Sequence, residues 1–224
     1  MTLETIVLPC GEGHCEFAII GLHGRNASGH AFLPLVRQLR FEAARWVLPS
    51  APLYGDDPAV RWWYEHETQN IGEIAAARAA LTDLLDAQVT DGIAPENIFL
   101  VGFSQGAVMA VDAAFRFPRR LGGVCALSGY VAHPALLASE IHPANKSLPV
   151  FLAHGVRDKI LSIEVGRRNH AELAAMGVDV EYREYDTTHR ISKAETTDIH
   201  AFLHRHMFGL DPGDPRLGYQ AVEF

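Results

Sequence analysis

Residues 98–106 constrain the fold of this chain more than any other stretch. They read Ile-Phe-Leu-Val-Gly-Phe-Ser-Gln-Gly, and an apolar segment typical of a buried helix follows over residues 107–114. A strand, a tight turn and a helix in this order are the setting of a nucleophile elbow, which strains the backbone of its serine. Side chains two residues away on either side would collide with that serine, so Gly102 and Gly106 are required by sterics. We therefore predict that Ser104 presents its hydroxyl at the sheet edge as a nucleophile; the alternative is an ordinary Gly-Ser turn.

The rest of the chain alternates between strand-like and helix-like segments. Strands are predicted over residues 5–8, 16–22, 45–48, 123–127, 150–153 and 178–185, helices over 30–40, 71–88, 162–176 and 192–207, and irregular segments over 53–69 and 130–148. This alternation is typical of an α/β fold with a mostly parallel central sheet and helices on both faces. The 224 residues suit one domain, with a core over residues 16–207 and an irregular C-terminal tail over 208–224.

Composition narrows the partners and the compartment. The net charge is −8 and no basic stripe is present, which argues against a nucleic acid or an anionic membrane surface as partner. No apolar run approaches the ~18 residues that span a bilayer, so stable membrane insertion is not expected. The N-terminus lacks the pattern of a signal peptide. The three cysteines cannot all pair, and Cys125 lies in an apolar run, which fits a core thiol and a reducing compartment. We expect a cytoplasmic protein.

Three polar residues follow predicted strands in the order Ser104, Asp158, His189. Parallel α/β sheets place their sites at the carboxyl ends of the strands, and Ser-Asp-His is the chain order of α/β-hydrolases. Because a serine hydroxyl needs a base, His189 would take its proton, and Asp158 would orient the imidazole. Asp158 could instead be a turn residue and His189 a solvated loop residue. Asp186 is the rival carboxylate, since it is close to His189 in the sequence.

A serine nucleophile also needs donors for the oxyanion that forms. The sequence predicts the backbone N–H of Gln105 and one N–H from the turn His23-Gly24-Arg25. His23 and His154 also stand at strand ends, each directly before a glycine, and we interpret both as structural hydrogen-bonding residues near the site.

Five short segments together resemble the phospholipase/carboxylesterase family, which includes small bacterial carboxylesterases and acyl-protein thioesterases. The segments are Leu22-His23-Gly24, Pro49-Ser50-Ala51-Pro52, Gly102-Phe103-Ser104-Gln105-Gly106, His154-Gly155-Val156-Arg157-Asp158 and Thr188-His189. The resemblance implies an α/β-hydrolase fold without a large lid domain, and hydrolysis of esters or thioesters without a metal or cofactor. It also implies the N–H groups of Arg25 and Gln105 as oxyanion donors, and it leaves a homodimer open.

The substrate is the least determined part of this prediction. The family turn usually reads His-Gly-x-Gly with an apolar x, whereas Arg25 places a cation there, which could bind an acidic substrate or point to solvent. Trp62, Trp63 and Leu161 are the predicted substrate contacts, with core packing under a long loop as the alternative for the tryptophans.

The sequence thus predicts a serine hydrolase that cleaves carboxylic esters or thioesters. We expect small-molecule substrates with short-to-medium acyl chains, because neither irregular segment suggests an apolar lid. Cleavage of an amide or lactone, or a scaffold used only for binding, are the alternatives. His200 and His204 are spaced like a metal pair, but no third ligand accompanies them, so no metal is expected.

Overall fold

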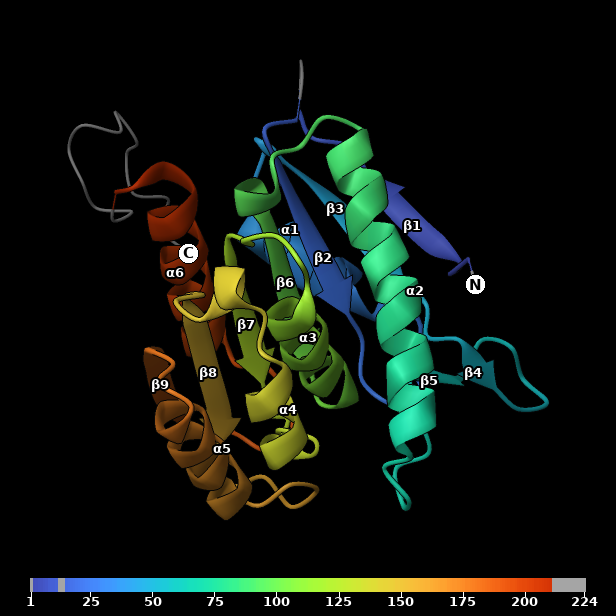
Figure 1. The fold of residues 1–224 in the computed structure, drawn as a ribbon, viewed down its shortest axis with the longest axis vertical. Coiled ribbons are helices and arrows are strands. Elements are labelled where there is room, and N and C mark those ends of the chain that lie inside the picture. Colours follow the sequence, from blue (N-terminus) through green and yellow to red (C-terminus); the bar gives the residue numbers. More distant parts are fainter. Residues whose placement is uncertain (1, 12–14, 211–224) are drawn as a thin grey trace.

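A seven-stranded sheet forms the centre of the molecule (Figure 1). The computed structural model describes residues 2–11 and 15–210, so most of the predicted tail lies outside the described residues. The strands are β1 (Thr5–Leu8), β2 (Phe17–Leu22), β3 (Ala44–Pro49), β6 (Ile98–Phe103), β7 (Gly123–Leu127), β8 (Val150–Gly155) and β9 (Val180–Tyr185). Their order is β1-β3-β2-β6-β7-β8-β9, and within this sheet β1 is antiparallel to β3 while the other pairs are parallel. The carboxyl ends of the parallel strands therefore meet at one edge.

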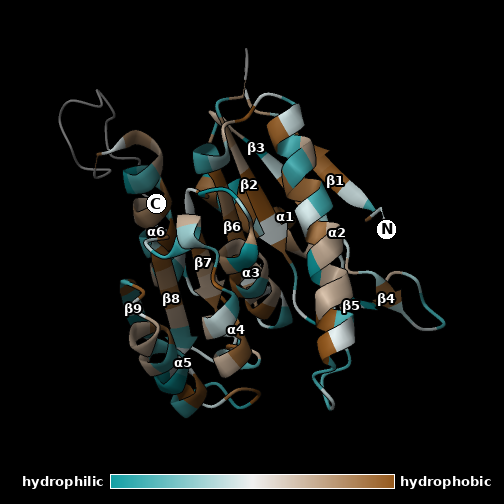
Figure 2. Ribbon diagram, in the orientation of Figure 1, coloured by the Kyte–Doolittle hydropathy of each residue, from teal (hydrophilic) through white to brown (hydrophobic). Residues whose placement is uncertain are grey.

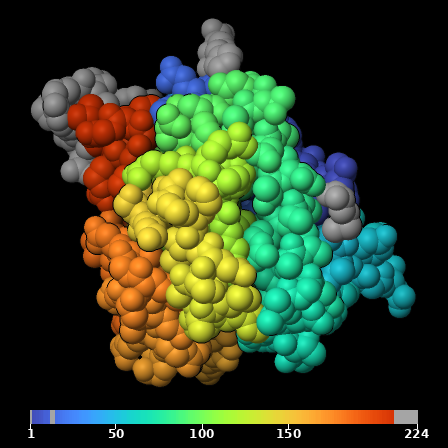
Figure 3. Space-filling view, viewed as in Figure 1, coloured from blue at the N-terminus to red at the C-terminus, as the bar shows by residue number. Residues whose placement is uncertain are grey.

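Helices cover both faces of the sheet (Figure 1). One face carries α2 (Ile71–Thr90), α3 (Gln105–Arg116), α4 (Pro134–Glu140) and α5 (Ile163–Ala175), and the other carries α1 (Leu33–Leu39) and α6 (Lys193–Phe208). Figure 3 shows α4 at the surface between α2 and α5. Short 3-10 turns lie at η1 (Gly29–Phe32), η2 (Pro95–Asn97) and η3 (Pro143–Asn145). The mostly parallel α/β sheet that the sequence predicts is confirmed.

The central strands β2, β6, β7 and β8 are mostly apolar along their whole length, as the colouring of the centre of the molecule in Figure 2 shows. Along β6, Ile98 and Leu100 pack in the core cluster under α2 and α3, while Phe99 and Val101 pack in the cluster under α1 and α6. Successive side chains of a strand point to opposite faces, so a strand covered on both sides must be apolar at every position. This explains why the central strands read as continuous apolar runs.

Two elements depart from the predicted loops. The segment 130–148 contains α4, which begins at a proline and buries Leu137. The segment 53–69 contains a small antiparallel hairpin of β4 (Leu53–Tyr54) and β5 (Arg61–Trp62). Both elements are too short to persist alone, so tertiary packing decides their structure and a local pattern does not reveal them.

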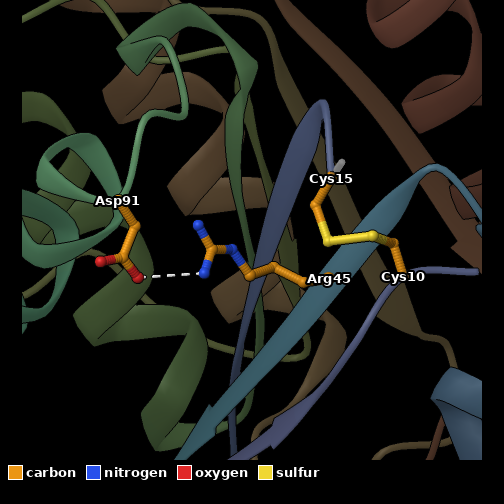
Figure 4. The surroundings of a disulfide bond; sticks show 4 residues. All are labelled: Cys10, Cys15, Arg45 and Asp91. Atoms are coloured by element: carbon orange, nitrogen blue, oxygen red, sulfur yellow. Dashed lines mark hydrogen bonds and ion pairs between the residues drawn. A yellow bond between two sulfur atoms is a disulfide. The ribbon is translucent and has the colours of Figure 1, made fainter. Parts of the chain in front are cut away.

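Cys10 and Cys15 form a disulfide bond, with 5.6 Å between their Cα atoms (Figure 4). The bond lies before β2, at the end of the sheet opposite to Ser104, and close to an ion pair of 3.0 Å between Arg45 and Asp91. Disulfides persist mainly in oxidising compartments, so this bond does not support the predicted reducing compartment.

Cys125 is fully buried in the core as expected, and burial raises the pKa of its thiol. No helix in the described part of the chain is long and apolar enough to cross a membrane.

A capping box begins α6. The N–H of Glu195 donates to the hydroxyl of Ser192, and the Ser192 N–H donates to Oε2 of Glu195, both at 3.2 Å. The other carboxyl oxygen, Oε1, is buried without a hydrogen-bond partner among the described residues. Burial raises the pKa of Glu195 to about 7, and the nearby charge of Asp198 adds to this. The helix cap therefore contains a carboxyl group that resists ionisation.

This raised pKa links stability to pH. An unfolded glutamate ionises near pH 4.5, whereas folded Glu195 keeps its proton up to about pH 7, so stability falls as pH rises through this window and the loss remains above it. Glu195→Gln keeps the cap acceptor and removes the titration. Both proteins are unfolded with a chemical denaturant at several pH values. Between about pH 5 and 8, the free energy of unfolding of the wild type should fall by about 2 kcal/mol more than that of Glu195→Gln. Glu42→Gln serves as the control at an exposed carboxylate, and a shift of the same size there would contradict this assignment.

Candidate active site

Ser104 stands between the end of β6 and the start of α3 with backbone angles φ 54° and ψ −121°. A positive φ is unfavourable for a residue with a Cβ, so the surroundings must hold it. The Ser104 N–H donates to the carbonyl of Leu127 on β7 at 2.8 Å. A Cβ on Gly102 would lie 2.3 Å from the carbonyl oxygen of Gly106, and one on Gly106 would lie 2.0 Å from that of Leu22. The strained turn is thus present and both glycines are sterically required, but the predicted reason is corrected, because the added side chains would collide with the backbone of Gly106 and Leu22 rather than with Ser104.

His189 forms hydrogen bonds with Ser104 and Asp158 at once. Its Nε2 is 2.9 Å from Ser104 Oγ, and its Nδ1 is 2.6 Å from Asp158 Oδ2. The imidazole also packs against the ring of Phe103, with 4.9 Å between ring centroids. Since Asp158 accepts from Nδ1, Nε2 is left free to accept the hydroxyl proton of Ser104. Three residues that are up to 85 positions apart in the chain therefore meet at the carboxyl edge of the sheet.

The carboxylate of Asp158 is enclosed, with its side chain fully buried. Its Oδ1 accepts from the N–H groups of Ile160 and Leu161 at 2.8 and 3.0 Å. Burial alone would raise the pKa of Asp158, but the hydrogen bonds from His189 and from these two N–H groups outweigh it and lower the pKa. Asp158 is therefore an ionised, fixed acceptor.

The rival Asp186 lies elsewhere. Its side chain is 80% exposed and pairs with Arg157 at 2.7 Å. The loop after β9 is instead pressed against the end of β8, because a Cβ on Gly155 would lie 2.6 Å from the carbonyl oxygen of Thr187. This close approach brings His189 over Asp158 rather than over Asp186.

The two N–H groups predicted as oxyanion donors belong to Gln105, directly after the serine, and to Arg25, directly after Gly24. Gln105 is the first residue of α3, where N–H groups have no partner within the helix. The Arg25 N–H donates no hydrogen bond to another described residue. A Cβ on Gly24, directly before Arg25, would lie 3.2 Å from the Ser104 Cβ, so this turn packs against the serine. Both N–H groups therefore lack a described acceptor and belong to segments next to Ser104.

Two buried histidines hold the backbone around the site. His23 Nε2 accepts from the Ala51 N–H at 2.9 Å, which places the ring proton on Nδ1, where it is shared with the Gly24 carbonyl at 2.7 Å. Burial lowers the pKa of His23 to about 4, so the ring stays neutral. His154 Nε2 lies 2.8 Å from the carbonyl oxygen of Leu161 and steadies the turn that follows Asp158. Both histidines act structurally, as their sequence positions indicated.

Trp63 is a core residue rather than a pocket wall. It has no exposed surface, and its indole N–H donates to the His23 carbonyl at 2.8 Å. The side chain of Gln105 accepts from the Trp63 N–H at 2.8 Å and donates to the Tyr64 carbonyl at 2.7 Å. These bonds leave Trp63 no route to a substrate, so the prediction for this residue is wrong and the core-packing alternative applies. Trp62 bonds Glu65 through its indole N–H at 2.7 Å.

A hollow of about 350 Å³ opens beside His189, between α1 and the loop that joins β9 to α6. Its apolar lining includes Phe32, Leu35, Phe103 and Ile191, and neither Trp62, Trp63 nor Leu161 belongs to it. Sequence reasoning missed this lining, because its members come from segments that are far apart in the chain. The signal available in the sequence was the position of Ile191, two residues after His189.

In the described part of the chain, no group of three or more His, Cys, Asp or Glu residues could hold a metal ion.

Comparisons with known proteins identify the family of the chain. Residues 4–207 match the model of the phospholipase/carboxylesterase family. A carboxylesterase of Arabidopsis thaliana, SOBER1, is 28% identical over 85% of this chain and 91% of its own length. An acyl-protein thioesterase 1 of Gibberella zeae is 27% identical over 92% of this chain and 96% of its own. The crystal structure of esterase PE8 superposes with a TM-score of 0.83 at 27% identity, covering 92% of this chain and 99% of that one.

Proposed function

The chain belongs to the phospholipase/carboxylesterase family and is a hydrolase of the carboxylesterase and thioesterase type, and from this premise we propose that Ser104, His189 and Asp158 form its catalytic triad. The observation that carries the proposal is that the two ring nitrogens of His189 contact two different side chains: Nε2 lies 2.9 Å from the hydroxyl of Ser104, and Nδ1 lies 2.6 Å from the carboxylate of Asp158. A base within hydrogen-bond reach of a nucleophile, oriented by a third group, is the arrangement that activates serine.

The reaction follows from these contacts. Ser104 Oγ attacks the carbonyl carbon of the ester or thioester while His189 Nε2 takes the hydroxyl proton. The same imidazole then protonates the leaving alcohol or thiol, which leaves an acyl group on Ser104. A water molecule, deprotonated by His189, hydrolyses this acyl-enzyme. Asp158 stays ionised throughout, because its hydrogen bonds lower its pKa, and it stabilises the imidazolium that forms.

The N–H groups of Arg25 and Gln105 stabilise the oxyanion. The negative charge develops on the carbonyl oxygen in the transition state, and fixed N–H donors stabilise it without having to reorganise. Support comes from the packing of the Gly24 turn against Ser104 and from the side chain of Gln105, whose two bonds to the segment of Trp63 hold its own backbone in place. Such donors contribute about 3 kcal/mol each in related chemistry.

Substitution of the two aspartates separates the proposed triad from its rival. Asp158→Asn should lower kcat by about four orders of magnitude, because an amide disfavours the imidazole tautomer that can accept the serine proton. Ser104→Ala should remove nearly all turnover. Asp186→Asn, which removes an exposed ion pair, is the matched control and should stay within about threefold of the wild type. A severe loss in Asp186→Asn with a mild loss in Asp158→Asn would contradict the assignment.

We further propose soluble esters or thioesters of short-to-medium acyl chains as substrates. The support is the limited size of the hollow beside His189, about 350 Å³, and its apolar lining by Phe32, Leu35 and Ile191. Each methylene buried there contributes about 0.8 kcal/mol, and a methylene that passes beyond the apolar lining contributes little.

The acyl-length profile tests this. Across p-nitrophenyl esters, kcat/KM should rise up to about fourfold per methylene and level off at about eight carbons. Leu35→Ala should flatten the rise, whereas Leu136→Ala, an apolar substitution on α4 away from the hollow, should leave it unchanged. A steady climb beyond about twelve carbons, with activation at a lipid interface, would show a long covered tunnel instead.

A further inference from the structure

The hollow beside His189 continues into a second one. The second hollow has a volume of about 370 Å³ and is bounded by α1, α6 and the segment that joins β9 to α6. Gln38, Ile191 and Thr196 line both hollows, so the two are adjacent, and we refer to both together as the groove. An ester held at Ser104 that extends into the first hollow therefore comes close to the residues that line the second.

Cationic side chains line this groove. Arg25 and Arg190 line the first hollow and Lys193 lines the second, while no Asp or Glu among the described residues lines either one. This is opposite to the chain as a whole, in which 27 acidic residues outnumber 19 basic ones. A concave surface lined by one sign of charge raises the local potential and attracts ligands of the opposite sign.

The charges of these cations are largely available. Arg25 lies 3.5 Å from the carboxylate of Glu67, whose side chain is 68% exposed, so this pair is weak. Arg190 donates from its Nε to the hydroxyl of Thr187 at 3.3 Å, and no described carboxylate forms an ion pair with Arg190 or with Lys193. Arg167, by contrast, pairs with both Glu164 and Glu184.

We propose that this groove selects esters or thioesters that carry an anionic group, a carboxylate or a phosphate, on the acyl or the alcohol part. The inference rests on the proposed function of Ser104. The apolar lining by Phe32, Leu35 and Ile191 takes the carbon chain. The anion is held by Arg190, which lines the first hollow, and by Lys193, which lines the second, while Arg25 adds to the positive potential near the oxyanion turn.

Matched ester pairs test the charge preference and locate it. The acyl pair is the mono-p-nitrophenyl ester of adipic acid against p-nitrophenyl hexanoate, and the alcohol pair is the hexanoyl ester of 4-hydroxybenzoate against that of its methyl ester. The measured quantity is the ratio of kcat/KM for the anionic and the neutral ester in each protein. Because this ratio is compared between variants, intrinsic reactivity and any general loss of activity cancel.

In at least one pair, Arg190→Gln should lower the ratio about threefold, and Arg190→Gln combined with Lys193→Gln about tenfold. The pair that responds identifies the anionic part. Arg190→Lys should keep most of the preference. Arg168→Gln, which removes an exposed cation of α5 outside the groove, is the control for net charge and should leave the ratio unchanged. Raising the salt concentration from about 20 to about 500 mM should lower the wild-type ratio of kcat/KM for the anionic ester to that for the neutral one.

Ratios that are unchanged in the double variant for both pairs would overturn the inference while ester hydrolysis itself continues. If neither member of any pair is hydrolysed by the wild type, the proposed function fails, and this inference fails with it.

Discussion

The site depends on a backbone contact that leaves no room for two side chains. The start of α3 presses against the ends of β2 and β6 so closely that a Cβ on Gly102 or Gly106 would lie within 2.3 Å of a backbone oxygen. This contact holds Ser104 at a positive φ, a strain that costs about 1–3 kcal/mol. The cost is offset by the hydrogen bond from Ser104 to β7 and by the burial of almost the whole of α3. Ser104, the proposed nucleophile, is therefore positioned before any substrate arrives.

A second close approach completes the arrangement. At the end of β8, the absence of a side chain on Gly155 lets the loop after β9 descend onto the strand, which places His189 over Asp158. The Asp158 carboxylate is held by two N–H groups of its own turn, and that turn is held by the buried His154. Each residue of the proposed triad thus has a fixed position, which the surrounding hydrogen bonds maintain. Such preorganisation is what a serine mechanism needs.

Short sequence patterns predicted those parts of the site that a single segment of the chain forms. The elbow is encoded within nine residues, and Asp158 and His189 could be found because each follows a strand of a parallel sheet. The choice between Asp158 and Asp186 could not be made from sequence spacing, since it depends on how closely the loop approaches Gly155. The groove was missed for the same reason, because its wall combines α1 with the loop before α6. Trp63 was misjudged because its aromatic character suits a pocket and a core equally.

The disulfide illustrates a different limit. Cys10 and Cys15 are close in the sequence, but pairing depends on the separation and direction of their side chains, which only the folded structure shows. A count of cysteines could not reveal this.

Covalent labelling tests the central claim most directly. The protein is incubated with a fluorophosphonate, residual esterase activity is followed over time, and the modified peptide is identified by tandem mass spectrometry. The account predicts one phosphonyl group per chain, attached to Ser104, formed in parallel with the loss of activity. Full activity after prolonged incubation, or inactivation with the adduct on another residue, would contradict it.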